Sequence, residues 1–309
     1  MKKKNFIIFI FAGIALLGVS FLKAPTATAQ ELDFEFYKEH IYMNTTVNGK
    51  PARLILDTGA SDIMLDSTFL ADSGLTFAKK GRARISGAGN GTEECSIIVD
   101  GVTVALGGRK FKPQFTAILD FREILESDKV DGLIGMKYLS DKVIKIDYKN
   151  QKITFLDKLN PEMAKSFSAV PIEWDPKHPG TSMFPMEVTL PSGKVIAGKA
   201  LLDTGAGVAV SFNATGAARF KLDEIEGKKP YEKKHGGVGG ADNGFKFDID
   251  GIKVGGLSVP VKEGYFSTNK NGAMAKASYI AIIGNKYWKN FDLILDVRNN
   301  KLYLKLITD

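Results

Sequence analysis

The sequence predicts a mostly β protein whose two halves are related by an approximate two-fold axis. Three observations carry this expectation. The tripeptide Asp-Thr-Gly occurs twice, an apolar hairpin-like segment precedes each copy, and strand signals dominate the remaining chain. The chain has 309 residues, of which 44% are hydrophobic and 25% charged, which suits a globular protein large enough for two cores.

The N-terminal segment is typical of a secretory signal peptide. Lysines at positions 2–4 precede an apolar run over 6–22, and Ala27-Thr28-Ala29 supplies a small-residue cleavage signal. A retained membrane anchor is the alternative, because this run is at the short limit for a membrane span. We expect cleavage after residues 1–29, export to a periplasm or to the extracellular space, and no stable membrane association afterwards.

Removing that segment lowers the formal net charge from +7 to +3, and the basic residues are dispersed. Nucleic-acid binding is therefore not expected. The one cysteine, Cys95, lies in a strand-like segment and cannot form a disulfide within the chain. The histidines His40, His178 and His235 lack metal-ligand spacing, so they are expected to be surface or loop residues, and no metal or other cofactor is expected.

The first element is a hairpin that runs into an acid. Residues 41–47 alternate in the manner of a strand, Asn48-Gly49 is a strong turn signal, and 52–56 return into Asp57. The second copy follows the same plan: residues 184–190, a turn at 191–193 and a return strand that ends at Asp203. An acid placed directly after three apolar residues is costly unless it is paired, capping or functional.

The similarity continues beyond the acids. Each copy then has a Gly-rich tip and an apolar segment that ends in glycine, and the distance from acid to glycine is 78 residues in the first copy and 81 in the second. Short helices are expected at 67–72 and 214–220. Five landmarks in one order indicate an internal duplication. The matched segments are 85–91 with 238–244, 131–135 with 280–284, and the polar-turn hairpins 144–155 with 293–304. The predicted organisation is a first lobe over 30–160, a Pro-rich linker over 161–181 and a second lobe over 182–309.

Equivalent residues near a two-fold axis meet, so Asp57 and Asp203 are expected to face each other. Two carboxylates at short range hold one proton between them. The ionised member can take a proton from water while the protonated member hydrogen-bonds to a substrate carbonyl, which permits direct attack of water on an amide.

The neighbouring residues fit such a pair. Gly59 and Gly205 allow close backbone approach, and Thr58 and Thr204 carry hydroxyls that can cross-link the two turns. The Gly-rich tips are expected to form either flaps that contact substrate or plain loops; the residues assigned to the flap role are Gly87, Ala88, Gly89, Gly240 and Ala241.

The two Asp-Thr-Gly-Ala copies, their hairpins and the segments ending in Ile-Gly resemble the aspartic proteases of the pepsin and retropepsin kind. The resemblance covers about residues 35–309. It implies a bilobal acid-protease fold, Asp57 and Asp203 as catalytic residues, and a Thr58–Thr204 grip between the lobes. It also implies a peptide or protein substrate and, because one chain carries both copies, a monomer.

Two departures from the family pattern affect specificity and pH dependence. Ser61 follows the first Asp-Thr-Gly-Ala, whereas Gly207 stands at the equivalent position, so the two acids are not chemically equivalent. The first tip has no tyrosine, unlike the flap of pepsin-like enzymes. Because Ala60 and Ala206 lack hydroxyls that would bond the outer carboxylate oxygens, we expect a less acidic pH optimum than that of pepsin.

Alternative interpretations remain open at this level. Either Asp alone can be a turn cap after a strand. A protein that binds peptides or serves in the envelope could keep the fold without turnover, and an enzyme that cuts only itself or one partner is a narrower option. A dinucleotide site is not expected, because the third glycine of G-x-G-x-x-G is replaced by Thr92 and Asp242. A serine hydrolase is not expected either, because the sequence contains no G-x-S-x-G nucleophile elbow.

Overall fold

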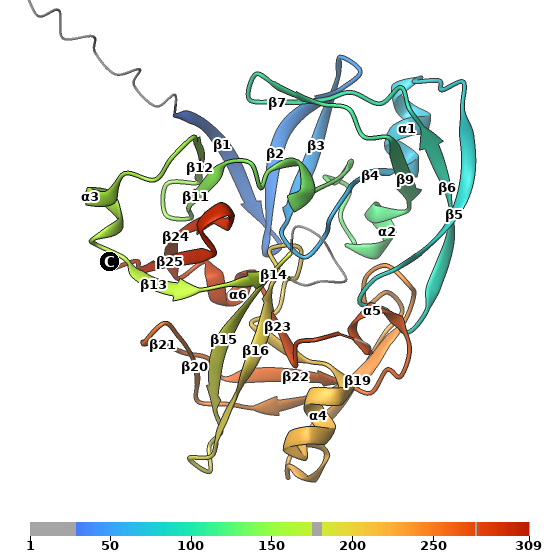
Figure 1. Cartoon of the computed structure of the whole chain (residues 1–309). Coiled ribbons are helices and arrows are strands. Elements are labelled where there is room, and N and C mark those ends of the chain that lie inside the picture. Colours follow the sequence, from blue (N-terminus) through green and yellow to red (C-terminus); the bar gives the residue numbers. More distant parts are fainter. Residues whose placement is uncertain (1–28, 175–180, 276, 309) are drawn as a thin grey trace, which may run out of the picture.

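The structure is a computed structural model that describes residues 29–174, 181–275 and 277–308. It is mostly β, as predicted, and Figure 1 shows its strands in an upper and a lower group with a further set of strands between them. Below, "first half" means residues 29–160 and "second half" means the described residues from 181 to 308. Of the residues assigned to the signal peptide, all but Ala29 lie outside the described residues, and His178 lies outside them as well. None of the described helices has the length and apolar character that a membrane span requires.

The larger sheet contains the strands of the first half, the strand at 168–171 and the last two strands of the chain. Within the described residues it has 15 strands, in the order β13-β25-β24-β11-β12-β1-β2-β3-β10-β4-β9-β6-β5, with β7 beside β2 and β8 beside β7. Its strands are β1 (Gln30–Tyr37), β2 (His40–Val47), β3 (Lys50–Asp57), β4 (Ile63–Asp66), β5 (Lys80–Ser86), β6 (Thr92–Val99), β7 (Val104–Leu106), β8 (Arg109–Phe111), β9 (Phe115–Leu119), β10 (Gly132–Gly135), β11 (Val143–Asp147), β12 (Lys152–Leu156), β13 (Ser168–Pro171), β24 (Phe291–Asp296) and β25 (Lys301–Leu306).

The second sheet belongs to the second half, apart from β14. It has 10 described strands in the order β18-β19-β22-β17-β23-β16-β15-β20-β21, with β14 beside β15. They are β14 (Glu173–Trp174), β15 (Ser182–Thr189), β16 (Val195–Leu202), β17 (Val210–Phe212), β18 (Lys229–Lys233), β19 (Asp242–Asp248), β20 (Gly251–Val254), β21 (Leu257–Pro260), β22 (Glu263–Ser267) and β23 (Ala281–Ile283).

Helices are short and lie at the ends of strands. The helices predicted at 67–72 and 214–220 are confirmed as α1 and α4, and both start at a residue whose side chain accepts a backbone N–H: Asp66 from Phe69, and Asn213 from Gly216. The helical elements are α1 (Ser67–Ser73), α2 (Phe121–Ile124), η1 (Met136–Tyr138), α3 (Pro161–Ala164), α4 (Ala214–Phe220), η2 (Leu222–Glu224), α5 (Gly272–Ala275), α6 (Asn285–Trp288) and η3 (Val297–Asn299).

The two hairpins that end in an acid have the predicted form. β2 pairs antiparallel with β3, and β15 with β16, each around a tight turn. In both halves the apolar segment that ends in glycine adds a parallel neighbour to the return strand: β10 to β3 and β23 to β16. Parallel strands buried on both faces read as continuous apolar runs, which is why 54–56 and 281–283 carry no polar residue.

The polar-turn hairpins join the halves. β11 pairs antiparallel with β24, with Ile144 opposite Leu295 and Ile146 opposite Leu293. The hairpin at 293–304 therefore lies in the sheet of the first half, although the sequence assigns it to the second lobe. The residues at this junction are buried, and one continuous hydrophobic core includes side chains from both halves, from Phe34 to Leu304. Separate smaller clusters flank it, and one of them bears on the candidate site.

Candidate active site

Asp57 and Asp203 meet at the junction of the two halves. Asp57 is the last residue of β3, where its partner on β10 is Gly135. Asp203 directly follows β16, and its amide donates to the Ile283 carbonyl at 3.0 Å. The two carboxyl groups are hydrogen-bonded to each other. A duplicated strand-to-turn connection thus presents both acids at one point.

Close approach of the two turns explains the glycine in each tripeptide. A Cβ added to Gly59 would lie 2.6 Å from Asp203 Cγ, and one added to Gly205 would lie 2.4 Å from Asp57 Cγ. Each glycine of one turn therefore faces the carboxyl group of the other, and any side chain at either position would displace it.

The threonines cross-link the two turns through four hydrogen bonds. The Thr58 amide donates to Thr204 Oγ1 at 3.1 Å, and the Thr204 amide donates to Thr58 Oγ1 at 2.9 Å. Each hydroxyl then donates to the strand of the opposite half, Thr58 to Leu202 O at 2.8 Å and Thr204 to Leu56 O at 2.7 Å. Both threonines are buried, so these bonds are shielded from water and fix the separation of the carboxyl groups.

Hydrogen bonding to the two carboxyl groups is unequal. Asp57 Oδ1 accepts the amides of Gly59 at 2.9 Å and Ala60 at 3.0 Å. Asp203 Oδ1 accepts the Gly205 amide at 2.9 Å, and the Ala206 amide lowers the pKa of Asp203 less than the Gly205 amide does. Burial raises the pKa of Asp57 to about 6 against the lowering effect of these amides. Burial, followed by the charge of Asp57, raises the pKa of Asp203 well above its ordinary value. A carboxylate that accepts more N–H donors stays ionised more readily, so Asp203 holds the shared proton.

A polar network centred on Asn285 of the second half, with Glu39 and Tyr148 of the first half, supports the second turn. Asn285 is fully buried and donates to Thr204 O at 2.6 Å and Glu39 O at 2.9 Å, while it accepts the Tyr148 hydroxyl at 2.6 Å. The equivalent residue in the first half is Met136, which is buried and apolar. The two turns therefore differ in the residue behind each one, Asn285 or Met136, as well as in Ser61 and Gly207, which follow the two Asp-Thr-Gly-Ala copies.

His40 belongs to the same support, and its expected placement at the surface or in a loop is wrong, because it is buried and begins β2. Its side chain is only 8% exposed, with Nε2 3.0 Å from the Gly205 carbonyl oxygen and Nδ1 2.7 Å from that of Lys38. Burial lowers the pKa of His40, which favours the neutral ring. Gly207 lies beside the turn before β2: a Cβ added to it would be in ordinary contact with Glu39 Cβ at 3.5 Å and His40 Cε1 at 3.6 Å.

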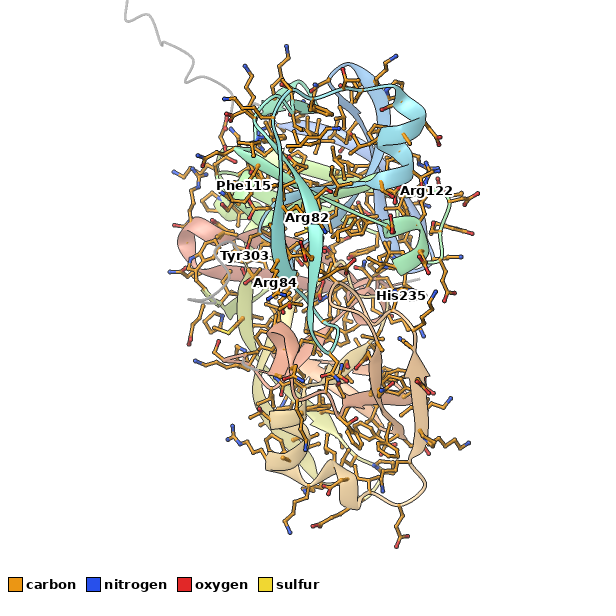
Figure 2. All side chains as sticks on the ribbon, turned by 90° about the vertical axis from the view of Figure 1, so that its right-hand side faces the viewer. Arg82, Arg84, Phe115, Arg122, His235 and Tyr303 are labelled. Carbon is orange, nitrogen blue, oxygen red and sulfur yellow. The ribbon has the colours of Figure 1, made fainter. Side chains whose placement is uncertain are left out.

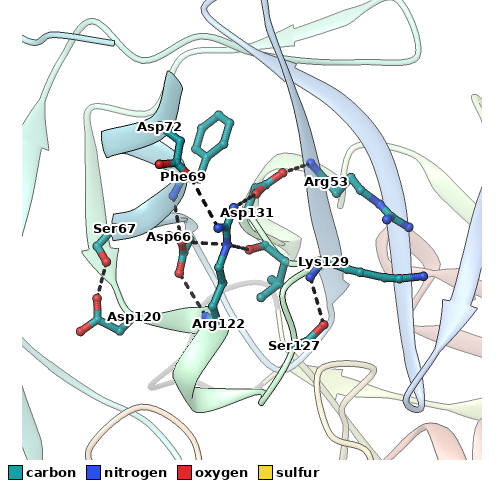
Figure 3. A network of polar contacts seen from close by, with 11 residues as sticks. Arg53, Asp66, Ser67, Phe69, Asp72, Asp120, Arg122, Ser127, Lys129 and Asp131 are labelled. Carbon is teal, nitrogen blue, oxygen red and sulfur yellow. Dashed lines mark hydrogen bonds and ion pairs between the residues drawn. The ribbon is translucent and has the colours of Figure 1, made fainter. Parts of the chain in front are cut away.

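A charged network holds the strands beside the first turn (Figure 3). Asp131, which precedes β10, accepts the Arg53 amide at 2.9 Å and contacts Arg122 Nη2 at 3.0 Å. Asp66, at the end of β4 and fully buried, accepts the amides of Phe69 at 2.9 Å and Arg122 at 3.1 Å. These bonds tie β3, β4 and β10 together at Arg53 and Asp131, at the end of the strands away from Asp57, which pairs with Gly135.

The two Gly-rich tips come from opposite halves and bond to each other. The Gly89 amide donates to Val238 O and the Asn90 amide to Ala241 O, both at 3.0 Å. The predicted flap residues of the first tip, Gly87, Ala88 and Gly89, are thereby brought next to the loop that holds Gly240 and Ala241: a Cβ on Gly237 would lie 3.2 Å from Ala88 Cβ, and one on Gly89 would lie 2.6 Å from Gly240 N.

Two hollows of about 690 and 620 Å³ lie elsewhere on the protein. The first is lined by Met186, Lys199 and Arg219 among others, the second by Gln30, Arg109 and Phe155, and neither touches Asp57 or Asp203. In the part of the chain that the structure describes, no group of three or more His, Cys, Asp or Glu side chains is placed to hold a metal ion.

The comparison with known families bears on the first half. Residues 43–138 match the model of a family described as aspartyl protease. The matched segment contains the first Asp-Thr-Gly and its Ile-Gly partner and ends before the second copy. This match supports a hydrolase that acts on peptide bonds. No curated protein matches the chain.

Proposed function

We propose that the protein is an aspartic endopeptidase in which Asp57 is the general base and Asp203 the general acid. The observation that carries this proposal is the hydrogen-bonded pair of carboxyl groups, both with raised pKa, on two turns cross-linked by Thr58 and Thr204. Environments that push two adjacent acids to different pKa values are characteristic of acid–base catalysis.

The chemistry follows from the unequal pair. Ionised Asp57 takes a proton from a water molecule, whose oxygen attacks the peptide carbonyl carbon. Protonated Asp203 donates its hydrogen bond, and then its proton, to the carbonyl oxygen as negative charge develops there. Collapse of the tetrahedral species breaks the C–N bond, the amine leaves with the proton that Asp57 received, and one hydroxyl proton of the intermediate returns to Asp203 as the C=O bond reforms. No covalent enzyme intermediate forms.

The wider organisation is part of the same proposal. Two lobes of the pepsin and retropepsin kind, residues 30–160 and 182–309, are joined by the linker 161–181 and act as a monomer. Removal of residues 1–29 releases the mature protein into a periplasm or outside the cell. The Gly-rich tips at 87–89 and 240–241 contact the substrate, which is a peptide or a protein.

The test is cleavage of a random peptide mixture by the purified protein from pH 3 to 8, with and without pepstatin. Asp57→Asn removes the proposed base, and Asp223→Asn, at an exposed position, is the matched control for loss of one charge. Cleavage that survives in the control and disappears in Asp57→Asn supports the proposal. A wild-type protein that binds peptides and cleaves none at any pH would favour the non-catalytic binding function, and cleavage confined to its own chain would narrow the proposal to autoprocessing.

A further inference from the structure

Residues 234–241, called here the 234–241 loop, extend from the second half to the first. The β5–β6 hairpin carries Arg82 and Arg84 and reaches from the upper half of the molecule toward the lower half (Figure 2). At its tip, in the bend between the two strands, it meets the loop, and the Gly89 and Asn90 amides donate to Val238 O and Ala241 O.

Backbone approaches in this contact are very close. A Cβ on Gly89 would lie 2.5 Å from Gly239 C, and one on Gly272 would lie 2.1 Å from Gly89 O. The Ala273 amide also donates to Gly87 O at 3.1 Å. The tip of the first half is thus held between the 234–241 loop and α5, and only glycine permits this fit.

Val238 places its side chain in an apolar cluster of the first half. This cluster, called here the first-half wall, surrounds buried Tyr42, Ile55 and Leu133. Ala60, whose amide bonds to Asp57, and Ile85 of the hairpin pack against it as well. Among the described residues of the wall, Val238 is the one contributed by the second half.

Ionic contacts fasten the base of the loop. Glu123 Oε1 of α2 lies 2.6 Å from Lys234 Nζ and 3.1 Å from His235 Nε2. The Gly239 amide donates to Glu93 Oε2 at 3.4 Å. Exposed ion pairs of this kind contribute little to stability, so the backbone bonds and the packing of Val238 are the main contacts that keep the loop in place.

We propose that Val238 occupies the apolar surface beside Asp57 that a substrate side chain contacts, and that the 234–241 loop lifts Val238 out of this surface before a peptide side chain takes its place. This inference rests on the proposed peptidase function and adds regulation and a side-chain preference to it. The loop presents to the hairpin what a peptide presents: backbone carbonyls for Gly89 and Asn90, and one aliphatic side chain for the first-half wall. The substrate class is therefore a peptide with a valine-sized aliphatic residue at the position that replaces Val238.

Thiol labelling tests whether the loop is seated, independently of any activity. In a Cys95→Ala background, the thiol of Val238→Cys is labelled with N-ethylmaleimide. Ser192→Cys, in an exposed turn, is the reference. The labelling rate of each folded variant is divided by the labelling rate of the same variant unfolded in urea. The seated loop predicts a normalised rate at least about tenfold lower for Val238→Cys, because the closed contact limits access. Equal normalised rates would overturn the inference.

Peptide kinetics test whether the seated loop competes with substrate. Val238→Ala removes two methyl groups from the wall, and Val195→Ala, at an exposed position in the β15–β16 hairpin, is the matched control. KM is expected to fall roughly fivefold in Val238→Ala with kcat unchanged, in proportion to the apolar area withdrawn. If the thiol of Val238→Cys is protected but the KM of Val238→Ala is unchanged, the seated loop does not compete with substrate, and the inference is overturned. Absence of cleavage by every variant would count against the peptidase function, while labelling would still decide whether the loop is seated.

Discussion

Replacing Thr204 with valine tests the cross-link between the two turns. Valine has nearly the same shape, so the change removes one hydroxyl that accepts the Thr58 amide at 3.1 Å and donates to Leu56 O at 2.7 Å. Thr58 is 2% exposed and Thr204 0%, so water cannot replace the lost partners. Since each buried group left without its partner costs about 1–3 kcal/mol, the free energy of unfolding is expected to fall by about 4 kcal/mol.

Thr204→Ser is the matched control because it keeps the hydroxyl and loses one methyl group, for about 1 kcal/mol. Urea unfolding followed by tryptophan fluorescence measures both, and Thr58→Val should repeat the result because its bonds mirror those of Thr204. Equal losses for Thr204→Val and Thr204→Ser would refute the reasoning, because the hydroxyl would then contribute nothing.

Three further predictions concern the acids and their support. Asp57→Asn should stabilise the protein by roughly 3 kcal/mol at pH 7.5, because a folded-state pKa of about 6 against 3.8 disfavours the charged carboxylate. The folded state binds more protons than the unfolded state between those two pKa values, so wild-type stability falls as the pH rises through this window. The stabilisation by Asp57→Asn should therefore disappear near pH 3. Thermal melts at pH 7.5 and pH 3 measure this stabilisation, and an equal stabilisation at both would contradict the pKa shift. In peptide hydrolysis, kcat/KM should rise as Asp57 loses its proton near pH 6 and fall once Asp203 loses its own; a rate maximum near pH 2 would be incompatible with the raised pKa values. Asn285→Leu should cost about 3 kcal/mol in urea unfolding, since it leaves Thr204 O, Glu39 O and the Tyr148 hydroxyl unpaired, whereas Met136→Leu should cost less than about 1.5 kcal/mol; similar costs would show that the support of the second turn is not polar.

Periodicity and duplication predict the local elements well. Asn48-Gly49 between alternating residues predicts the β2–β3 hairpin, and the apolar run before each acid predicts the two strands that carry the acids. The two tripeptides also predict which side chains meet, because a duplicated chain brings equivalent turns together. These signals are local or are doubled within the sequence, so one sequence is enough to detect them.

Contacts between unlike parts of the chain leave no such signal. Nothing near His40 indicates that its ring lies 3.0 Å from Gly205 O, a partner 165 positions away. A hint existed for Asn285, since a polar residue follows the second Ile-Gly where the first copy has Met136. Insertion of Val238 into the first-half wall depends on the three-dimensional meeting of two glycine-rich tips, which residue types alone do not specify.

Cleavage of one good peptide by Asp57→Asn, Asp203→Asn and the double variant tests the central claim most directly. If the two carboxyl groups act as one unit, each single replacement lowers kcat/KM by at least about 10³-fold, and the double variant is no slower than the slower single variant. Wild-type kcat/KM in either single variant, with the protein folded, would contradict the assignment of Asp57 and Asp203 as a catalytic pair.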